Sequence, residues 1–348
     1  MLRVALVAFY VRGAMGHYLD ALIPHIAEKT ELHLFLPDHY DGRVGGSHFH
    51  SLGIGRSRPE ALLRFLKSLG GRGLWEGIED VDLIHLFSGE GCPFSLHLTS
   101  ISQRRGIPLL ITLHDPSPHP GNLWEMLDSA IRRFIIPKAH SVHVHSEVFR
   151  EAVLKLGARR VKVIPHGSIA ERFTRYRRDD VSREPVALFF GRMEAYKGLD
   201  TLVRAALMLN GRMRFVIAGP GRIPRPLLNI IGRNPHIFEL HNRYLSDEEV
   251  AELFQRSSVL VLPYKHATQS SLPLIAASFG LPVVATAVGA FLEDVPRVGG
   301  ILVPPREPKA LAEAILRAKE VAPRYPRELE MHLIAGRFVE WYREAMGE

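Results

Sequence analysis

Two glycine-bearing turns carry the residues of this chain that could do chemistry on a phosphate. One holds Gly13 and Gly16; the other reads Gly191-Arg192-Met193-Glu194-Ala195-Tyr196-Lys197-Gly198. A buried parallel strand that ends in glycine and opens a helix presents unpaired N–H groups and a positive dipole end to an anion. Arg192 adds a fixed fork of donors and Lys197 a mobile point charge. The pattern predicts a phosphate site in which both cations stabilise a departing diphosphate, the alternative being two surface cations near a helix start.

A histidine provides a second candidate for chemistry. His114 directly follows the apolar run 108–113, so its side chain should emerge at the carboxyl edge of a parallel sheet, where α/β folds keep their sites. The proline-rich residues 115–121 after it form a loop that can hold the imidazole in one orientation. We therefore expect His114 to act on the bound ligand, with a plain polar role as the alternative.

Alternating strands and helices must position these residues. Apolar runs and helical stretches follow one another from end to end, which predicts an α/β fold with parallel sheets covered on both faces. The strands are predicted at 2–9, 31–36, 83–87, 108–113, 141–144 and 161–164, and then at 186–190, 214–218, 236–240, 259–262, 283–286 and 300–303.

The length of 348 residues suits two domains. The polar, arginine-rich segment 169–184 lacks apolar periodicity and is predicted to be the linker. The expected domains are 1–168 completed by 328–348, and 185–325.

Composition excludes several classes of protein. No apolar run approaches the roughly 20 residues of a membrane span, and the first residues lack a signal-peptide pattern, so we expect a cytoplasmic protein. The single cysteine, Cys92, excludes an intrachain disulfide and a cysteine-based metal site.

The net charge of +7 and the pI near 9.6 favour phosphorylated ligands or an anionic membrane face. Basic and apolar residues alternate at helical spacing from Arg56 to Lys67, which predicts a peripheral contact with the inner face of the membrane or a helix packed on its own sheet. Nucleic acid is not expected as a partner, since no recognition motif accompanies the charge.

Three motifs, in order and spacing, resemble the retaining glycosyltransferases of family 4, which have the GT-B fold. They are Phe190-Gly191-Arg192 with Tyr196-Lys197-Gly198-Leu199-Asp200-Thr201-Leu202, then Ile217-Ala218-Gly219-Pro220-Gly221, then Gly280-Leu281-Pro282-Val283-Val284-Ala285-Thr286. The match spans most of 186–316, and the first half matches more loosely through the first glycine turn and Thr112-Leu113-His114-Asp115-Pro116. The resemblance implies two Rossmann-like domains around an interdomain cleft, with a final helix, here 328–346, crossing back to the first domain.

The chain departs from the family pattern at the donor sugar. The two glutamates of the family would fall on Ala267 and Ile275, and both are missing. In their place Gln269-Ser270-Ser271 resembles a Gln-Ser-Gly variant of the same family, predicted to hold the pyrophosphate, with helix capping as the alternative. The predicted donor-binding residues are Gly13, Gly16, Arg192, Lys197, Gly219, Arg243, Tyr244, Leu245, Gln269, Ser270, Ser271 and Leu272. Of these, the segment 241–245 is expected to bind the base through its backbone.

Other signals are discounted. Asp80-Val81-Asp82 precedes a strand and is interpreted as a polar strand start rather than a metal motif. His140, His143 and His145 have no carboxylate or cysteine at ligand spacing, so no metal site is expected.

The resemblance implies transfer of a sugar, with retention of configuration, from a UDP- or GDP-sugar to the hydroxyl of a sugar, glycolipid or small molecule, without a metal or a tightly bound cofactor. His114, Arg192 and Lys197 would be catalytic. The acceptor-side candidates are His17, Tyr18, Asp115 and His119. A non-catalytic GT-B subunit that binds nucleotide or sugar is the alternative, and a membrane-surface scaffold is a third.

Overall fold

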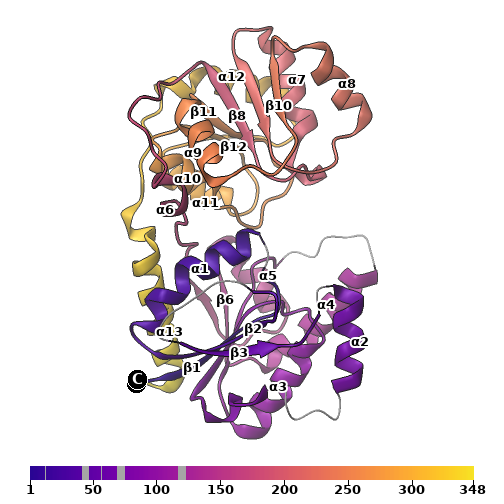
Figure 1. Ribbon diagram of the computed structural model, residues 1–348, viewed down its shortest axis with the longest axis vertical. Coiled ribbons are helices and arrows are strands. Elements are labelled where there is room, and N and C mark those ends of the chain that lie inside the picture. The colour runs from indigo at the N-terminus through magenta and orange to yellow at the C-terminus, as the bar shows by residue number, and fades with distance from the viewer. Residues whose placement is uncertain (12, 41–46, 56, 69–74, 117–122) are drawn as a thin grey trace. The chain divides into compact units, whose positions relative to one another are not determined.

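The computed structural model describes residues 1–11, 13–40, 47–55, 57–68, 75–116 and 123–348. They form two compact units, labelled by element in Figure 1. Unit 1 comprises Met1–Gly167 and Glu328–Glu348, and unit 2 comprises Ser168–Arg327. The last segment of the chain therefore belongs to the first unit, as the resemblance implied for 328–346.

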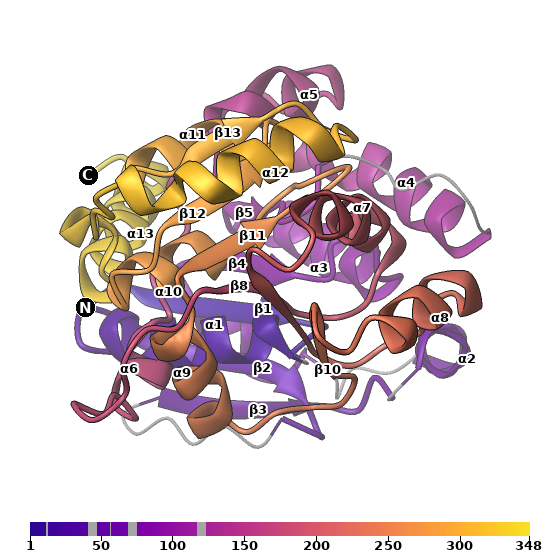
Figure 2. The same ribbon diagram turned by 90° about the horizontal axis from the view of Figure 1, so that it is seen from above.

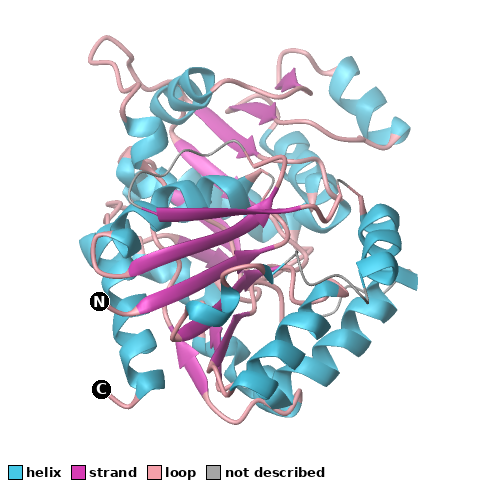
Figure 3. Cartoon of the chain, turned by 60° about the horizontal axis from the view of Figure 1, so that its bottom comes forward, coloured by secondary structure: helices cyan, strands magenta, loops and turns pink. Residues whose placement is uncertain are grey.

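Unit 1 is a parallel sheet with the strand order β3-β2-β1-β4-β5-β6-β7. Its described strands are β1 (Arg3–Ala8), β2 (Glu31–Pro37), β3 (Ser47–Leu52), β4 (Leu83–Ser88), β5 (Leu109–Thr112), β6 (Ser141–Val144) and β7 (Val161–Val163). Its described α-helices are α1 (Ala14–Ala27), α2 (Arg58–Ser68), α3 (Phe94–Arg105), α4 (Leu123–Ile135), α5 (Arg150–Lys155) and α13 (Met331–Met346). In Figure 3 helices lie on both sides of this sheet, as buried parallel strands require.

The final helix α13 completes the core of unit 1. It packs against α1, beside which it runs in Figure 1, and Phe338 and Tyr342 are fully buried. The indole N–H of Trp341 donates to the hydroxyl of Ser141 on β6 over 3.0 Å. Residues 200 positions apart in sequence therefore share one polar contact inside the core.

A chain of buried polar groups, here called the histidine network, begins at this helix. His143 Nε2 lies 2.9 Å from the carbonyl of Ile164, which can only accept, so the neutral ring carries its proton there and Nδ1 accepts from Thr112 at 3.0 Å. Thr112 then accepts from His85 Nε2 at 2.7 Å, and His85 Nδ1 accepts from the Tyr342 hydroxyl at 2.7 Å. Burial lowers the pKa of His143 to about 3 and that of His85 well below its usual range, so both rings stay neutral.

Unit 2 is a second parallel sheet, with the strand order β10-β9-β8-β11-β12-β13. Its strands are β8 (Val186–Phe190), β9 (Arg214–Ala218), β10 (Phe238–His241), β11 (Val259–Leu262), β12 (Val283–Thr286) and β13 (Ile301–Val303). Its α-helices are α6 (Glu171–Thr174), α7 (Leu199–Leu209), α8 (Arg225–Arg233), α9 (Asp247–Arg256), α10 (Leu272–Ser278), α11 (Phe291–Arg297) and α12 (Pro308–Arg317). Figure 2 shows α7 and α12, which are in contact, along one face of this sheet, where Leu202, Phe215 and Leu311 form part of the core.

The segment 169–184, predicted as the linker, lies within unit 2. Arg172 forms an ion pair with Asp247 over 2.8 Å. The side-chain amide of Gln255 exchanges two hydrogen bonds with the backbone of Arg178, and Arg183 donates to the carbonyls of Ser257 and Phe279. Polar contacts therefore attach this segment to α9 and its surroundings, which is why the segment needs no periodic apolar residues.

The predicted strands are found within one or two residues of the expected ends, and the helix 328–346 is confirmed as α13 after a short 3₁₀ turn. The sequence analysis missed β3. This strand lies at the sheet edge, and its pattern Ser-His-Phe-His-Ser-Leu buries only Leu52 fully. An edge strand of this kind lacks the continuous apolar run that marks an internal parallel strand.

Among the described helices, none combines the length and the apolar character that crossing a bilayer requires.

We expect Tyr342→Phe to lower the free energy of unfolding of unit 1 by about 1–3 kcal/mol, because His85 Nδ1 loses its buried donor. All three tryptophans, at 75, 124 and 341, belong to unit 1, so urea unfolding followed by their fluorescence reports this unit. Tyr10→Phe is the control, since Tyr10 belongs to the same unit and is 41% exposed, so the change should stay within about 0.5 kcal/mol. Equal midpoints for the two variants would show that the network contributes no stability.

Candidate functional site

The strand order of unit 2 reverses between β8 and β11, and six of the twelve predicted donor residues lie in the segments that follow these two strands. The chain leaves β8 toward β9 and β10, and later returns to the other side of β8 as β11. The turn 191–198 follows β8, and the segment 263–272 follows β11. Ligands of open α/β sheets bind at the carboxyl ends of strands where the order reverses. Topology therefore brings together two segments that lie more than 60 residues apart.

Two glycines allow close approach between backbone segments, and between the backbone and the Lys197 side chain, at this edge of the sheet. Gly191 has φ +121°, and a side chain there would collide with the ammonium of Lys197. Gly219, after β9, has φ +129°, and a Cβ would lie 2.7 Å from the carbonyl carbon of Gly191. Only glycine adopts both conformations without strain. The turn after β8 is thus shaped around the Lys197 side chain.

Lys197 is a buried cation. Its residue is 8% exposed, and its Nζ lies 5.2 Å from the ring centre of Tyr264. Burial, followed by the charge of Arg192, lowers the pKa of Lys197 to about 8, against a partly opposing effect of Glu194. An anion placed beside this ammonium would restore the charged form that burial disfavours.

Arg192 lies in the open. Its side chain is 68% exposed and its guanidinium is 3.3 Å from a carboxylate oxygen of Glu194. An exposed ion pair of this kind contributes little stability, so the exchange of Glu194 for a phosphate costs little. Arg192 and Lys197 therefore present one solvated and one desolvated cation on the same turn.

The segment after β11 places Gln269 and Ser270 near Tyr264. The amide nitrogen of Gln269 is buried and has no hydrogen-bond partner among the described residues. Ser270 accepts from the backbone N–H of Leu272 at 3.3 Å and is hydrogen-bonded to the Tyr264 hydroxyl. Ser271 precedes α10 without a side-chain capping bond in the described structure. Ser270 therefore has the local role proposed by the capping alternative, whereas Gln269 retains a buried donor that an acceptor atom could satisfy.

The segment predicted to bind the base follows β10. Tyr244 is 81% exposed and Leu245 is partly buried. The Arg243 guanidinium is bound to the carboxylate of Glu249, whose pKa falls to about 2 because Arg243 and Ser246 donate to it. The Arg243 side chain is thus used to hold its own loop, and the backbone of the segment is what remains for a ligand.

In unit 1 the first glycine turn opens α1 after β1, where the strand order also reverses between β1 and β4. Gly13 is the residue before α1, and its carbonyl accepts from the N–H of His17 at 3.2 Å. Gly16 is buried in the first turn. Tyr18, predicted on the acceptor side, is only 2% exposed, so its side chain belongs to the core of unit 1 rather than to an open surface.

The reason for this burial is a ring cluster. The Tyr18 hydroxyl accepts from the N–H of Gly167 at 3.2 Å, and the ring stacks on Phe87 with centroids 5.8 Å apart. Its ring centre is also 4.3 Å from that of His166. Burial raises the pKa of Tyr18 and lowers that of His166 to about 3, so neither group exchanges a proton near neutral pH.

His114 follows β5 as predicted, and both of its ring nitrogens have partners. His145 Nδ1 lies 3.2 Å from the Ile164 carbonyl, so neutral His145 donates there and its Nε2 accepts from His114 Nδ1 at 3.0 Å. Burial keeps the pKa of His145 well below its usual range. His114 Nε2 lies 2.9 Å from the carbonyl of Phe87, which also only accepts. Both contacts are hydrogen bonds only when His114 carries two protons, so this geometry suits an imidazolium.

Beyond His114 lies an ion pair that the sequence analysis missed. Glu90, 5% exposed, follows β4 and pairs with Arg132 of α4 over 2.7 Å. Arg132 also donates to the carbonyl of Asp115 at 3.0 Å, so it ties the loop after His114 to the end of β4. The sequence signal that could have identified Glu90 is a glutamate placed just after a buried strand. His119 lies outside the described residues.

The discounted motifs are accounted for. Asp82 accepts from the N–H and the guanidinium of Arg3 at the start of β1, which confirms the polar strand start and lowers its carboxyl pKa. His143 and His145 both donate to Ile164 within the histidine network.

The predicted basic helix forms as α2, while Arg56 lies outside the described residues. Leu63 and Leu66 are more than half exposed on it, whereas Arg64 donates to Glu60 and to the carbonyl of Gly53. Peripheral membrane contact through α2 stays a proposal, and failure of the protein to co-sediment with anionic vesicles would contradict it.

Comparison with curated proteins finds relatives that transfer sugars. The chain is 28% identical over 250 residues to alpha-D-kanosaminyltransferase from Streptomyces kanamyceticus, which covers 62% of each chain. It is 28% identical over 176 residues to glycogen synthase from Thermus thermophilus, covering 47% of this chain and 40% of the relative. The matched regions thus span less than two thirds of the length of these relatives.

Solved structures match over nearly the whole length. Sucrose-phosphate synthase from Thermosynechococcus elongatus superposes with a TM-score of 0.73 at 18% identity, covering 100% of both chains. Anabaena HepE in complex with UDP-glucose gives 0.70 at 16% identity, covering 99% of this chain and 100% of the other. At this identity the likeness shows the GT-B fold.

The family models identify each half. Residues 13–167 match the glycosyl transferase 4-like domain, and residues 184–320 match glycosyl transferases group 1. With both halves matched in the order of the GT-B fold, the chain belongs to the family 4-like glycosyltransferases.

Proposed function

We propose that this protein transfers a sugar from a nucleotide-diphosphate sugar to an acceptor hydroxyl, with retention of configuration. The observation that carries the proposal is the buried ammonium of Lys197 beside Arg192, at the strand-order reversal of unit 2. A diphosphate leaving group gains negative charge as the glycosidic bond breaks, so cations fixed beside it stabilise the transition state more than the ground state. The low exposure of Lys197 strengthens this effect.

The donor is proposed to be a UDP- or GDP-sugar. Anabaena HepE was solved with UDP-glucose, and two similar Burkholderia structures are described as UDP-forming trehalose-phosphate synthases, which supports a uridine donor. The diphosphate would accept from Arg192, Lys197 and the side-chain amide of Gln269, whose nitrogen has no partner among the described residues. The backbone of 243–245 would bind the base, and Gly219 allows close approach of the chain.

Unit 1 would supply the acceptor side. A doubly protonated His114 can direct an N–H toward a sugar oxygen when it exchanges the Phe87 carbonyl for the ligand, while His145 keeps hold of the other nitrogen. His17 and Asp115 lie at the same sheet edge and are proposed to contact the acceptor, a sugar, glycolipid or small molecule. We propose no enzymic nucleophile, and the departing phosphate itself would take the acceptor proton.

The alternative is a non-catalytic subunit that binds nucleotide or sugar. It is favoured by Ala267 and Ile275, which are 7% and 2% exposed at the places of the two family glutamates and provide no carboxylate. Turnover distinguishes the two functions, since a binding subunit would neither transfer nor hydrolyse the sugar.

We expect Lys197→Met and Arg192→Ala each to reduce turnover by roughly 10²-fold to 10³-fold, as removal of one oxyanion donor does, because the leaving group loses a cation. Release of nucleoside diphosphate from a panel of UDP- and GDP-sugars measures this. Arg204→Ala is the matched control, because Arg204 is an exposed arginine on α7, the helix that follows the turn. This variant should keep wild-type turnover. Near-normal turnover in both site variants would remove the donor-phosphate assignment.

The affinity for nucleoside diphosphate should fall as pH rises. With the pKa of Lys197 lowered to about 8, the ammonium is charged below pH 8 and is lost above it, while the terminal phosphate (second pKa about 6) is already ionised. Affinity should therefore be steady from pH 7 to 8 and then decrease by at most about tenfold per pH unit. Calorimetry on wild type and Lys197→Met checks this, because the neutral variant should bind weakly with no such slope. A slope that persists in Lys197→Met would assign it to another group.

A reciprocal pair of variants tests the division of roles between the units. Gln269→Leu should weaken nucleoside diphosphate binding by roughly 10-fold to 150-fold, since one hydrogen bond to a charged group is worth about 1.5–3 kcal/mol. His114→Ala should leave that affinity nearly unchanged and yet strongly reduce transfer. Both are measured by calorimetry with nucleoside diphosphate and by transfer rate. If His114→Ala reduced binding and transfer equally, His114 would belong to the donor site or to the core.

A further inference from the structure

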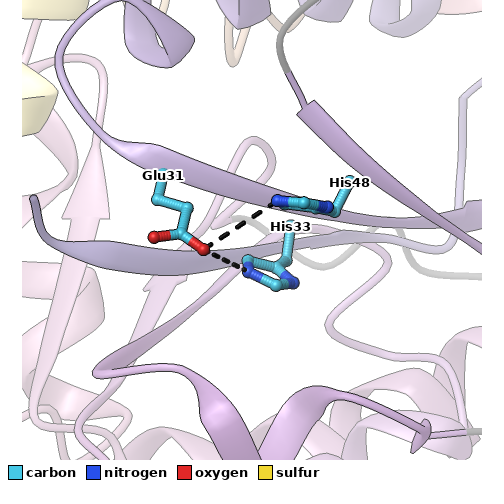
Figure 4. Close-up of side chains that lie close together, drawn as sticks. All are labelled: Glu31, His33 and His48. Atoms are coloured by element: carbon cyan, nitrogen blue, oxygen red, sulfur yellow. Dashed lines mark ion pairs between the residues drawn. The ribbon is translucent and has the colours of Figure 1, made fainter.

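Three side chains with metal-binding chemistry meet on the two outermost strands at one edge of the unit 1 sheet. Glu31 and His33 lie on β2, and His48 lies on β3. His33 and His48 are direct partners in the parallel register. Because successive side chains of a strand alternate between faces, Glu31, His33 and His48 project from the same face of the sheet. Figure 4 shows both imidazole rings turned toward the Glu31 carboxylate.

The distances are close to those of a zinc site. Glu31 Oε1 lies 3.5 Å from His33 Nε2 and 3.9 Å from His48 Nε2, and the three ligand atoms all lie within 4.8 Å of one another. Tetrahedral Zn²⁺ with bonds of about 2.0–2.2 Å places its ligands roughly 3.3–3.6 Å apart. The His48 ring stacks on that of His33 with centroids 4.7 Å apart, while the side chains of His48 and Glu31 are 63% and 43% exposed and can make the remaining small approach.

A fourth residue orients the cluster. His33 Nδ1 lies 3.2 Å from His50 Nε2, and the His50 ring stacks on Phe35 with centroids 4.4 Å apart. When His33 donates from Nδ1 to His50, its Nε2 presents a lone pair toward Glu31. That Nε2 atom is buried and has no hydrogen-bond partner among the described residues. Metal-ligating histidines are commonly held in this way by a partner on the other ring nitrogen.

We propose that Glu31, His33 and His48 bind one Zn²⁺ ion, with His50 as the positioning residue and water in the fourth position. Two imidazoles and one carboxylate suit Zn²⁺ better than the harder Mg²⁺ or Ca²⁺. Glu31 and His33 lie at the amino-terminal start of β2, whereas the proposed sugar chemistry uses the carboxyl ends of the strands. The ion therefore acts as a clip that holds the edge strand β3 to β2.

Zinc binding is measured on the full chain without a polyhistidine tag, by equilibrium dialysis with ZnCl₂ and by competition with a chromophoric chelator. We expect one ion per chain in wild type. His48→Ala and Glu31→Gln should each lower the affinity by about 100-fold or more, and His50→Leu by about 10-fold to 100-fold, the range for outer partners of metal ligands. Zinc should also raise the midpoint of urea unfolding, followed by tryptophan fluorescence, in wild type but not in Glu31→Gln.

His332→Ala is the matched control, because His332 is an exposed histidine 3.7 Å from the single carboxylate of Glu330. It should bind zinc as wild type does. Circular dichroism of each variant verifies the fold, and the exposure of His48 makes His48→Ala the safest variant. Absence of bound zinc in wild type, or equal affinity in wild type, His48→Ala and Glu31→Gln, would overturn the proposal.

Discussion

The burial of one positive charge governs the carboxyl edge of unit 2. An ammonium removed from water loses solvation that only fixed dipoles or an anion can replace, and Lys197 accordingly has a lowered pKa. Its position requires glycine at 191 and is supported by the ring of Tyr264. The neighbouring Lys265 pairs with Asp200 over 2.8 Å and donates from its backbone to Tyr196, so the two segments that flank the strand reversal hold each other in place. The turn after β8 and the segment after β11 thus form one structural feature.

In unit 1 the main constraint is that histidine side chains are buried in the core and must find their hydrogen-bond partners there. The carbonyl of Ile164 accepts hydrogen bonds from both His143 and His145, and this fixes the direction of the hydrogen bonds on either side. Toward α13 the bonds end at a hydroxyl that can donate, and all groups are satisfied while neutral. Toward His114 they end at the carbonyl of Phe87, which can only accept. One hydrogen-bonded chain thus runs from the Tyr342 hydroxyl of α13 to His114 after β5.

The sequence predicted the features that depend on local pattern. Internal strands, the glycine turns, His114 after β5 and the final helix all follow from apolar runs and motif spacing. Features that depend on pairing between distant segments were not accessible. Tyr18 follows a functional-looking turn, but its burial results from Phe87, His166 and Gly167, which belong to other elements. Glu31, His33 and His48 have no motif spacing, because a register between two strands brings them together.

The position of α13 in the chain has a consequence for synthesis on the ribosome. Unit 2 is contiguous, and each of its strands and helices is available once residue 327 has been made. Unit 1 begins before unit 2 but lacks Trp341 and Tyr342 until α13 has been made, so Ser141 and His85 have no partners on this helix throughout the synthesis of unit 2. Domains otherwise tend to complete in order from the amino terminus. Here unit 1 precedes unit 2 in the chain but closes its core only after unit 2 has been made, and a ribosome that stalls between residue 327 and α13 leaves the partners of this helix exposed to water.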